Sequence, residues 1–265
     1  MTDEVQAPVP CVGKPVSNDW WAGLRDATTA RIGLGRIGDA QPIASVLAFQ
    51  LDHARARDAI HTPLNVELLQ QALGTSPSFT VSSRAANRGE YLRRPDLGRS
   101  LDEASWPENI ALSDDGYDCA FVLGDGLSAI ATQCHAVALL NACVSRLGDW
   151  RIAPVAIAQQ ARVALGDEIG DRLRARIVVI LLGERPGLST ADSLGAYLTF
   201  APRKGRRDSE RNCVSNIHAN GLSTEGAAEK ICWLLREAVR LGLTGTELKD
   251  DASKLPLAEG REITN

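Results

Sequence analysis

The sequence predicts an α/β protein in which an open, largely parallel sheet follows a mainly helical N-terminal region. After about residue 108, short apolar runs alternate with longer helical patterns, as in parallel sheets whose strands are joined by helices. One of these runs, Ile177 to Leu182 (IVVILL), is apolar on both faces, which is typical of a strand inside such a sheet. We therefore expect a flexible segment at 1–18, a helical accessory region at 19–108 and an α/β domain at 109–265.

The overall composition is that of an ordinary globular protein. The chain has 265 residues, of which 44% are hydrophobic and 23% are charged, and its formal net charge is -4. A charge this small does not indicate a nucleic-acid partner, and no apolar run approaches the ~20 residues of a membrane span. The six cysteines form no CxxC pair, and no secretory leader is recognisable. We therefore expect a soluble protein of a reducing cytosol, without a zinc ribbon or a disulfide framework.

Two helices and one loop are expected in the accessory region. The first helix should run from Pro42 to about His61, because proline suits a first helical turn and apolar residues then recur at helical spacing. The second should run from Val66 to Leu73 and stop at Gly74. The segment Arg88 to Arg99 (RGEYLRRPDLGR) combines many arginines with glycine and proline, so we expect a structured loop there.

The expected α/β domain contains four strands and three helices. Ser223 is a candidate N-cap for the last helix and Gly242 its stop. The expected strands are Cys119 to Leu123, Pro154 to Ala158, Ile177 to Leu182 and Ala196 to Phe200, and the expected helices are Leu127 to Leu147, Asp167 to Leu173 and Ser223 to Leu241.

Ligands of open α/β sheets bind outside the carboxyl ends of the strands. That rule selects three loops of this chain: Gly124 to Ser128, Gln160 to Gly166, and Gly183 to Ser193. The sequence therefore predicts a ligand site where these three loops meet.

Two glycine-containing motifs have both a functional and a structural interpretation. Gly33 to Gly38 (GLGRIG) matches the GxGxxG pattern of dinucleotide-binding loops, which requires a preceding buried strand. Because Leu24 to Ile32 (LRDATTARI) is charged and alternates poorly, we interpret the motif as a turn before a helix. In Gly124 to Ser128 (GDGLS), the backbone N–H groups could meet a polar ligand, or Asp125 or Ser128 could cap the helix, and both interpretations stay open.

Other polar residues indicate no metal cage and no nucleophile. From spacing alone, Glu184 is more simply an ion-pair partner of Arg185 than a ligand-binding acid. Cys213 falls in a polar stretch (RNCVSN) that we expect to be a loop, and no base for a thiol nucleophile is recognisable. The run Arg203 to Arg207 (RKGRR) is expected to be a solvated loop, which could also meet phosphate or an acidic partner. The residues alone therefore predict an α/β ligand-binding protein.

Several long stretches together resemble the small subunit of ethanolamine ammonia-lyase. They follow the order of that family and cover the chain from about Leu24 to Asp250. The stretches are TTARIGLGRIGDAQP (28–42), FQLDHARARDAIHTPL (49–64), YLRRPDLGRSL (91–101), GDGLSAIAT (124–132), RVALGDEIGD (162–171) and LLGERPGLSTADSLGAYLTFAPRKGRRDSERNCVSNIHANGLS (181–223).

The resemblance implies a Rossmann-like, cobalamin-binding fold for this chain. It also implies a large subunit, a TIM barrel that holds ethanolamine, with adenosylcobalamin between the two chains. The pair would convert ethanolamine to acetaldehyde and ammonia by a radical mechanism, in which the cofactor supplies the chemistry and the protein supplies position and environment. This chain alone is then expected to be inactive.

The resemblance implies three cofactor-binding residues in this chain, at positions that match the family's cobalamin contacts: Val163, Glu184 and Cys213. Val163 and Glu184 fall in two of the expected loops, and a carboxylate accepts hydrogen bonds from the amide arms that rim a corrin. Cys213 would be a small packing residue and not a nucleophile. The resemblance implies no catalytic residue and no metal ligand in this chain. A DxHxxG signature is absent, so cobalamin is expected to keep its own dimethylbenzimidazole ligand.

Two other functions remain alternatives. One is a cobalamin-binding assembly adaptor without lyase activity, against which the continuous family resemblance counts. The other is an NAD-dependent oxidoreductase that uses GLGRIG, against which the missing strand before Gly33 counts. For the lyase subunit, the expected location is the cytoplasm, within a bacterial microcompartment. An apolar patch is expected where the large chain docks, because an obligate interface resembles a domain core cut in half.

Overall fold

The computed structural model describes residues 20–110 and 112–249. The predicted flexible segment 1–18 lies outside these residues. The chain divides between Gln50 and Leu51 into two compact units. Helix α1 (Ala22–Asp26) belongs to the first unit, and helix α2 (Ile43–His61) runs across the division. None of the helices within the described ranges is both long and apolar enough to cross a membrane.

The glycine-rich motif of the first unit forms a turn before α2. Gly33, Gly35 and Gly38 all have positive φ angles, and Ile37 and Ala40 form a short bridge after the helix α1 and a stretch without strand. A dinucleotide-binding loop would follow a strand at this point, so the structure contradicts that interpretation of GLGRIG. Helix α2 begins as predicted, because the carbonyl of Pro42 accepts hydrogen bonds from the first helical N–H groups.

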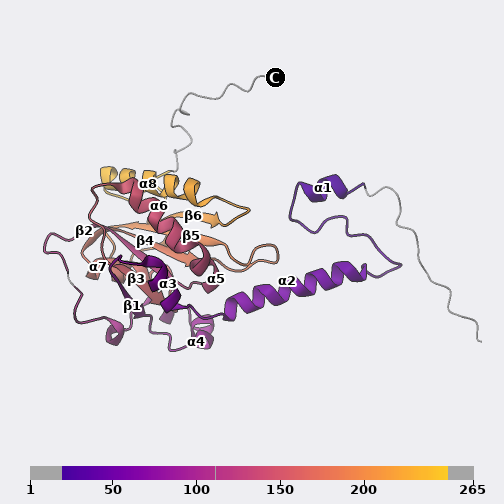
Figure 1. Cartoon of the computed structure of the whole chain (residues 1–265), viewed down its shortest axis with the longest axis horizontal. Coiled ribbons are helices and arrows are strands. Elements are labelled where there is room, and N and C mark those ends of the chain that lie inside the picture. Colours follow the sequence, from indigo (N-terminus) through magenta and orange to yellow (C-terminus); the bar gives the residue numbers. More distant parts are fainter. Residues whose placement is uncertain (1–19, 111, 250–265) are drawn as a thin grey trace, which may run out of the picture. The chain divides into compact units, whose positions relative to one another are not determined.

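The second unit is built on one six-stranded sheet with the order β1-β3-β2-β4-β5-β6 (Figure 1). Its strands are β1 (Ser78–Ser82), β2 (Tyr117–Gly124), β3 (Val155–Gln159), β4 (Ala175–Gly183), β5 (Leu194–Phe200) and β6 (Asn212–Ile217). The first four in spatial order are parallel, whereas β5 is antiparallel to both of its neighbours. The α/β class is confirmed; the sheet is mixed, because β5 interrupts the parallel arrangement that we predicted. The loop from β4 to β5 contains no helix, so the chain returns directly and the pair is antiparallel.

The helices of the second unit lie on both faces of this sheet. They are α3 (Val66–Leu73), α4 (Arg88–Arg93), α5 (Ala129–Ala131), α6 (Val137–Leu147), α7 (Leu165–Arg172) and α8 (Thr224–Leu241), with a π-turn at Thr132–Ala136 and 3-10 turns at Leu97–Arg99, Glu103–Ser105 and Asp208–Glu210. The predicted ends of α8 are confirmed: the Ser223 side chain accepts a hydrogen bond from Gly226 N at 3.2 Å, and Gly242 ends the helix in a left-handed conformation.

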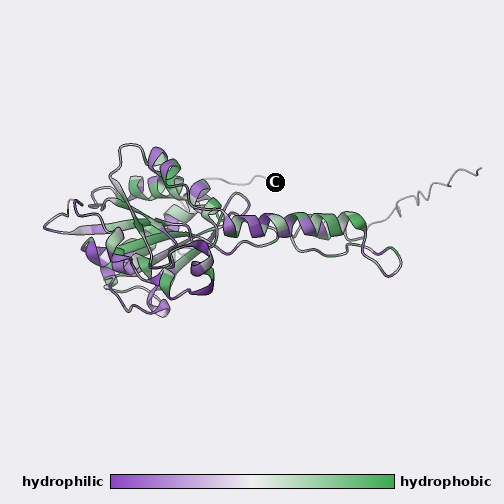
Figure 2. Ribbon diagram, turned by 90° about the horizontal axis from the view of Figure 1, so that it is seen from below, coloured by the Kyte–Doolittle hydropathy of each residue, from purple (hydrophilic) through white to green (hydrophobic). Residues whose placement is uncertain are grey.

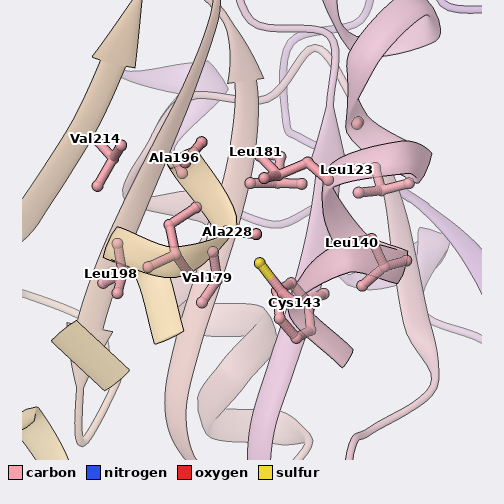
Figure 3. Packing of buried hydrophobic residues seen from close by; sticks show 14 of the residues in the cluster. Leu123, Leu140, Cys143, Val179, Leu181, Ala196, Leu198, Val214 and Ala228 are labelled. Atoms are coloured by element: carbon pink, nitrogen blue, oxygen red, sulfur yellow. The ribbon is translucent and has the colours of Figure 1, made fainter. Parts of the chain in front are cut away.

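The core has two layers, one on each face of the sheet. On one face, side chains of the central strands pack against α6 and α8, as Figure 3 shows for Leu181, Cys143 and Ala228. On the other face, Val178 and Ile180 pack against α7. The apolar colouring of the strands in Figure 2 follows from this double coverage. Each fully buried aliphatic side chain contributes about 1.5–3 kcal/mol, so these strands are a rigid base for the loops at their ends.

Two local predictions are wrong. Arg88 to Arg99 is not a loop throughout, because α4 occupies its first half. The side chain of Asn87 accepts a hydrogen bond from Glu90 N at 3.0 Å, and the Glu90 carboxylate accepts one from Ala86 N at 2.8 Å. This pair of bonds starts a helix despite the neighbouring glycine. Cys213 is likewise not in a loop but in strand β6, in which only Val214 and Ile217 are buried.

Candidate functional site

The three predicted loops meet at the carboxyl edge of the parallel strands. Leu127 N donates a hydrogen bond to Gly183 O at 2.8 Å, which joins the first loop to the third. The carboxylate of Asp125 accepts hydrogen bonds from Gln160 N at 2.9 Å and Ala161 N at 2.8 Å, which joins the first loop to the second. Ser128, and not Asp125, is the helix cap in this loop, since its side chain accepts a hydrogen bond from Ala131 N.

Asp125 is buried, and its position is further fixed by Arg88 of α4. The guanidinium lies 3.4 Å from the carboxylate and donates to Gly126 O at 2.8 Å and to Ile60 O at 2.6 Å. Burial raises the pKa of Asp125 to about 6, while the two amide donors and Arg88 act in the opposite direction. Asp125 thus connects its own loop to residues 160–161 and, through Arg88, to α4.

Two glycines let the first and third loops approach each other closely. A Cβ atom on Gly183 would lie 1.9 Å from Ser128 O, and one on Gly126 would lie 2.3 Å from Gly183 O. Gly126 also has a φ of +54°, a conformation that other residues rarely adopt. The two loops are therefore in direct backbone contact at these glycines.

Tyr91 of α4 contacts two arginines at this edge. The Arg88 guanidinium lies over the ring, 4.7 Å from its centre, and that of Arg162 lies over it at 4.3 Å. The Tyr91 hydroxyl donates to Ala161 O at 3.0 Å, and burial raises the pKa of this hydroxyl. Cation–π contacts of this kind hold the planar groups in place. Sequence reasoning gave none of these three side chains a role.

Two pockets of about 330 Å³ each lie side by side at this edge and share Arg162, Val163 and Tyr197. We call the two together the edge trough. The first pocket also has Glu184 in its lining, and the second has Cys213. The structure thus brings all three predicted cofactor-binding residues to one surface, with Val163 in the shared middle. Their role toward a cofactor stays a prediction.

Glu184 makes no ion pair with Arg185 among the described residues, so the simpler interpretation of this acid is not supported. Its Oε2 accepts a short hydrogen bond of 2.5 Å from Ser193 Oγ and a longer one of 3.3 Å from Asn216 N. No described residue donates to Oε1. Glu184 therefore keeps a free acceptor at the wall of the trough.

Cys213 lies opposite Tyr197 on the paired strands β6 and β5. Although the residue is exposed at the surface, partial loss of water around the sulfur raises the pKa of its thiol. The thiol is therefore protonated at neutral pH and is a poor nucleophile or metal ligand. Within residues 20–110 and 112–249, no cluster of three or more histidine, cysteine or acidic side chains could hold a metal ion.

A second buried ion pair lies beside the second pocket, whose lining includes Arg211. Arg211, which precedes β6, donates to the carboxylate of Asp167 on α7 at 2.5 Å, and both side chains are almost fully buried. Burial raises the pKa of Asp167 to about 6, although Arg211 opposes this shift. The pair holds β6 against α7 and leaves Arg211 little freedom to bind a ligand.

The sequence was compared with known protein families and curated proteins. The family model described as "Ethanolamine ammonia-lyase light chain (EutC)" matches residues 18–249. The chain is 53% identical over 235 residues to the ethanolamine ammonia-lyase small subunit of Bradyrhizobium diazoefficiens, which covers 87% of this chain and 90% of that protein. It is 48% identical over 249 residues to the small subunit of Azotobacter vinelandii, covering 90% and 91%, and 50% identical over 246 residues to that of Rhodopseudomonas palustris, covering 91% and 94%.

Proposed function

This chain belongs to the ethanolamine ammonia-lyase light-chain family, and on that premise we propose that it is the small subunit of such an enzyme and binds adenosylcobalamin at the edge trough. A large chain would cover the opposite side of the cofactor and hold ethanolamine in a TIM barrel. The main observation in favour is that Val163, Glu184 and Cys213, from three separate elements, line adjoining pockets. When bound, adenosylcobalamin supplies the radical chemistry by which ethanolamine becomes acetaldehyde and ammonia.

The groups in the trough fit a corrin with its rim of amide arms. The free Oε1 of Glu184 can accept a hydrogen bond from an amide N–H of such an arm. Val163 and Tyr197 supply apolar contact area. Cys213 adds a small neutral side chain, since its thiol stays protonated.

The size of the trough supports the need for a partner. A complete cobalamin is larger than either of the adjoining pockets, so this chain can enclose only part of the cofactor. The other part needs a second surface, which agrees with the name "small subunit" of the relatives. Most of the large apolar side chains that are more than one-third exposed lie within residues 20–51, among them Trp20, Ile43 and Leu47. We propose that the large chain covers them.

A reconstitution assay tests the proposed function. Ethanolamine deamination is measured with added adenosylcobalamin for this chain alone, for a large subunit alone and for their mixture. Activity in the mixture only is the expected result. A mixture that co-purifies with bound cobalamin but stays inactive would instead support the adaptor alternative. We further propose a cytoplasmic location within a microcompartment, and any targeting signal in 1–18 lies outside the described residues.

A single substitution tests the cofactor contact directly. In the assembled complex, Glu184→Gln should weaken cobalamin retention several-fold, because it exchanges a charged acceptor for a neutral one. Glu229→Gln, an exposed position on α8 at the opposite face of the sheet, is the matched control. Retention is measured by equilibrium dialysis, and far-ultraviolet circular dichroism checks the fold. Equal retention by both variants would remove Glu184 from the binding site.

A further inference from the structure

Arg162 occupies the middle of the edge trough and is held there by its backbone and stem. Its N–H donates to Gly98 O at 2.8 Å, and a Cβ atom on Gly98 would lie 2.8 Å from Arg162 Cγ. Only glycine at residue 98 therefore lets the arginine stem pass this close. Arg162 is in the lining of both pockets, so its side chain lies where the two pockets join.

The guanidinium of Arg162 has hydrogen-bond donors to spare. Stacking on Tyr91 fixes its plane, and Nη2 donates to Tyr91 O at 3.3 Å. Nε is buried, so a ligand in the pocket cannot reach it, but Nη1 has no acceptor among the described residues. A guanidinium carries five N–H donors and always keeps its charge, so a fixed one with unused donors in a pocket suits an anion.

The other charged groups of the second pocket are already engaged to different degrees. Arg211 is neutralised by Asp167 and donates to two backbone carbonyls, so its role is structural. Arg99 is about half exposed and donates to the exposed carboxylate of Asp208 at 3.1 Å. Among the described cations of this pocket, Arg162 is therefore the one without a carboxylate partner, with Arg99 as a second donor and Asp208 as a competitor for an anion.

We propose that Arg162 binds the phosphodiester of the cofactor's nucleotide loop, which is the fixed negative charge of a cobalamin. This inference rests on the proposed function and adds to it the orientation of the cofactor in the edge trough. The corrin would cover the pocket with Glu184, and the nucleotide loop would enter the pocket with Arg99 and Cys213. Arginine binds phosphate oxygens through two parallel N–H bonds, which gives both affinity and orientation.

Cobinamide, a corrin without the nucleotide loop and its phosphate, is the probe that separates the two parts of the ligand. Affinities for cobalamin and cobinamide are measured by absorbance titration of the full chain assembled with a large subunit. Arg162→Met keeps the apolar stem and removes the charge. It should weaken cobalamin binding about tenfold, the effect of one charge-assisted hydrogen bond, and change cobinamide binding less than twofold.

Three further variants complete the test. Arg185→Met makes the same change in the first pocket only, so it should not discriminate between the two ligands. Arg162→Lys keeps the charge and should recover part of the cobalamin affinity. Asp208→Asn removes the competing carboxylate and should tighten cobalamin binding while leaving cobinamide binding unchanged.

The possible results separate this inference from the proposed function. If Arg162→Met weakens both ligands equally, Arg162 acts on the corrin or on the fold, and the phosphodiester assignment is overturned. If the wild-type complex binds cobalamin but Glu184→Gln leaves both affinities unchanged, the Glu184 contact fails while the Arg162 assignment is judged separately. If the wild-type complex binds neither ligand, the proposed function itself fails.

Discussion

The parallel and antiparallel halves of the sheet each depend on one buried carboxylate, but the two carboxylates are satisfied differently. In the parallel half (β1, β3, β2 and β4), Asp125 accepts two backbone N–H groups, and Arg88 is 3.4 Å away with other acceptors of its own. Beside the antiparallel half (β5 and β6), Asp167 of α7 has Arg211, which precedes β6, as its partner at 2.5 Å. The first carboxylate holds loops together through the backbone, whereas the second neutralises a buried charge.

This difference indicates how each half presents its part of the edge trough. The parallel half supplies loops whose backbone is fixed by hydrogen bonds, and these loops bring Val163 and Glu184 to the edge. The antiparallel half supplies Tyr197 and Cys213 from the paired strands β5 and β6, and the ion pair holds β6 in place. We expect damage to the ion pair to cost more stability than damage to the loop connection.

The largest effect is predicted for Asp167→Asn. The substitution leaves Arg211 charged and buried without its carboxylate, which should lower the free energy of unfolding by about 3–5 kcal/mol. Asp125→Asn should cost only about 1–2 kcal/mol at neutral pH, because the amide oxygen still accepts a backbone N–H and Arg88 keeps two carbonyl acceptors. Urea unfolding of the full chain at pH 7 measures both values.

A double variant checks the reason for this difference. Asp167→Leu with Arg211→Met replaces the buried pair by apolar side chains and should be far less destabilised than either single variant. If the double variant is as unstable as Asp167→Asn, the pair stabilises the antiparallel half through its geometry and not through charge compensation. If Asp167→Asn and Asp125→Asn lower the free energy of unfolding equally, the two carboxylates do not differ in how they stabilise the two halves of the sheet.

The next effect concerns the close approach of loops in the parallel half. A methyl group on Gly183 meets a backbone carbonyl that cannot rotate away, so Gly183→Ala should lower the free energy of unfolding by about 3 kcal/mol. Gly187→Ala in the same loop is the matched control, since its new methyl group would lie at an ordinary 3.5 Å from the nearest atom. Thermal unfolding compares the two, and a similar loss in both would mean that the loop as a whole, and not the crossing at Gly183, limits stability.

The two halves also differ in how much of them the sequence could predict. β2 and β4 are buried on both faces, so their runs of apolar residues were visible in the sequence. β6 buries only Val214 and Ile217 and exposes Cys213 and Ser215, because its other face borders the trough. That strand therefore looked like a polar loop. The sheet is mixed because β5 runs antiparallel to both β4 and β6, which no local pattern indicated.

The candidate site was predictable only as far as a topological rule applies. The rule for carboxyl ends selected the loops with Val163 and Glu184 before any resemblance was considered. It could not select Tyr91, whose hydroxyl bonds a carbonyl 70 residues away, or Arg88, which bonds the first loop across 38 residues. Such partners depend on how α4 packs against the sheet edge, and the arginine-rich sequence around them indicated only a loop.

The last prediction concerns pH and the carboxylate of the parallel half. Burial raises the pKa of Asp125 from its ordinary value of 3.8 to about 6. Between these values the folded chain binds more protons at this group than the unfolded chain does, so the contribution of Asp125 to stability is lost as pH rises through the window. Asparagine does not titrate. The difference in unfolding free energy between the wild type and Asp125→Asn should therefore fall by up to about 3 kcal/mol from pH 4 to pH 7.

Urea unfolding of both proteins at several pH values across this window measures that difference. A difference that grows with rising pH would mean that Arg88 and the two amide donors outweigh burial and hold the carboxylate in its charged form. Asp125 would then act mainly as a charged partner of Arg88 and of the two amide donors. A falling difference means that the loops at the edge trough are joined most firmly when Asp125 is protonated, so cobalamin retention should be compared at pH 5 and pH 7 as well.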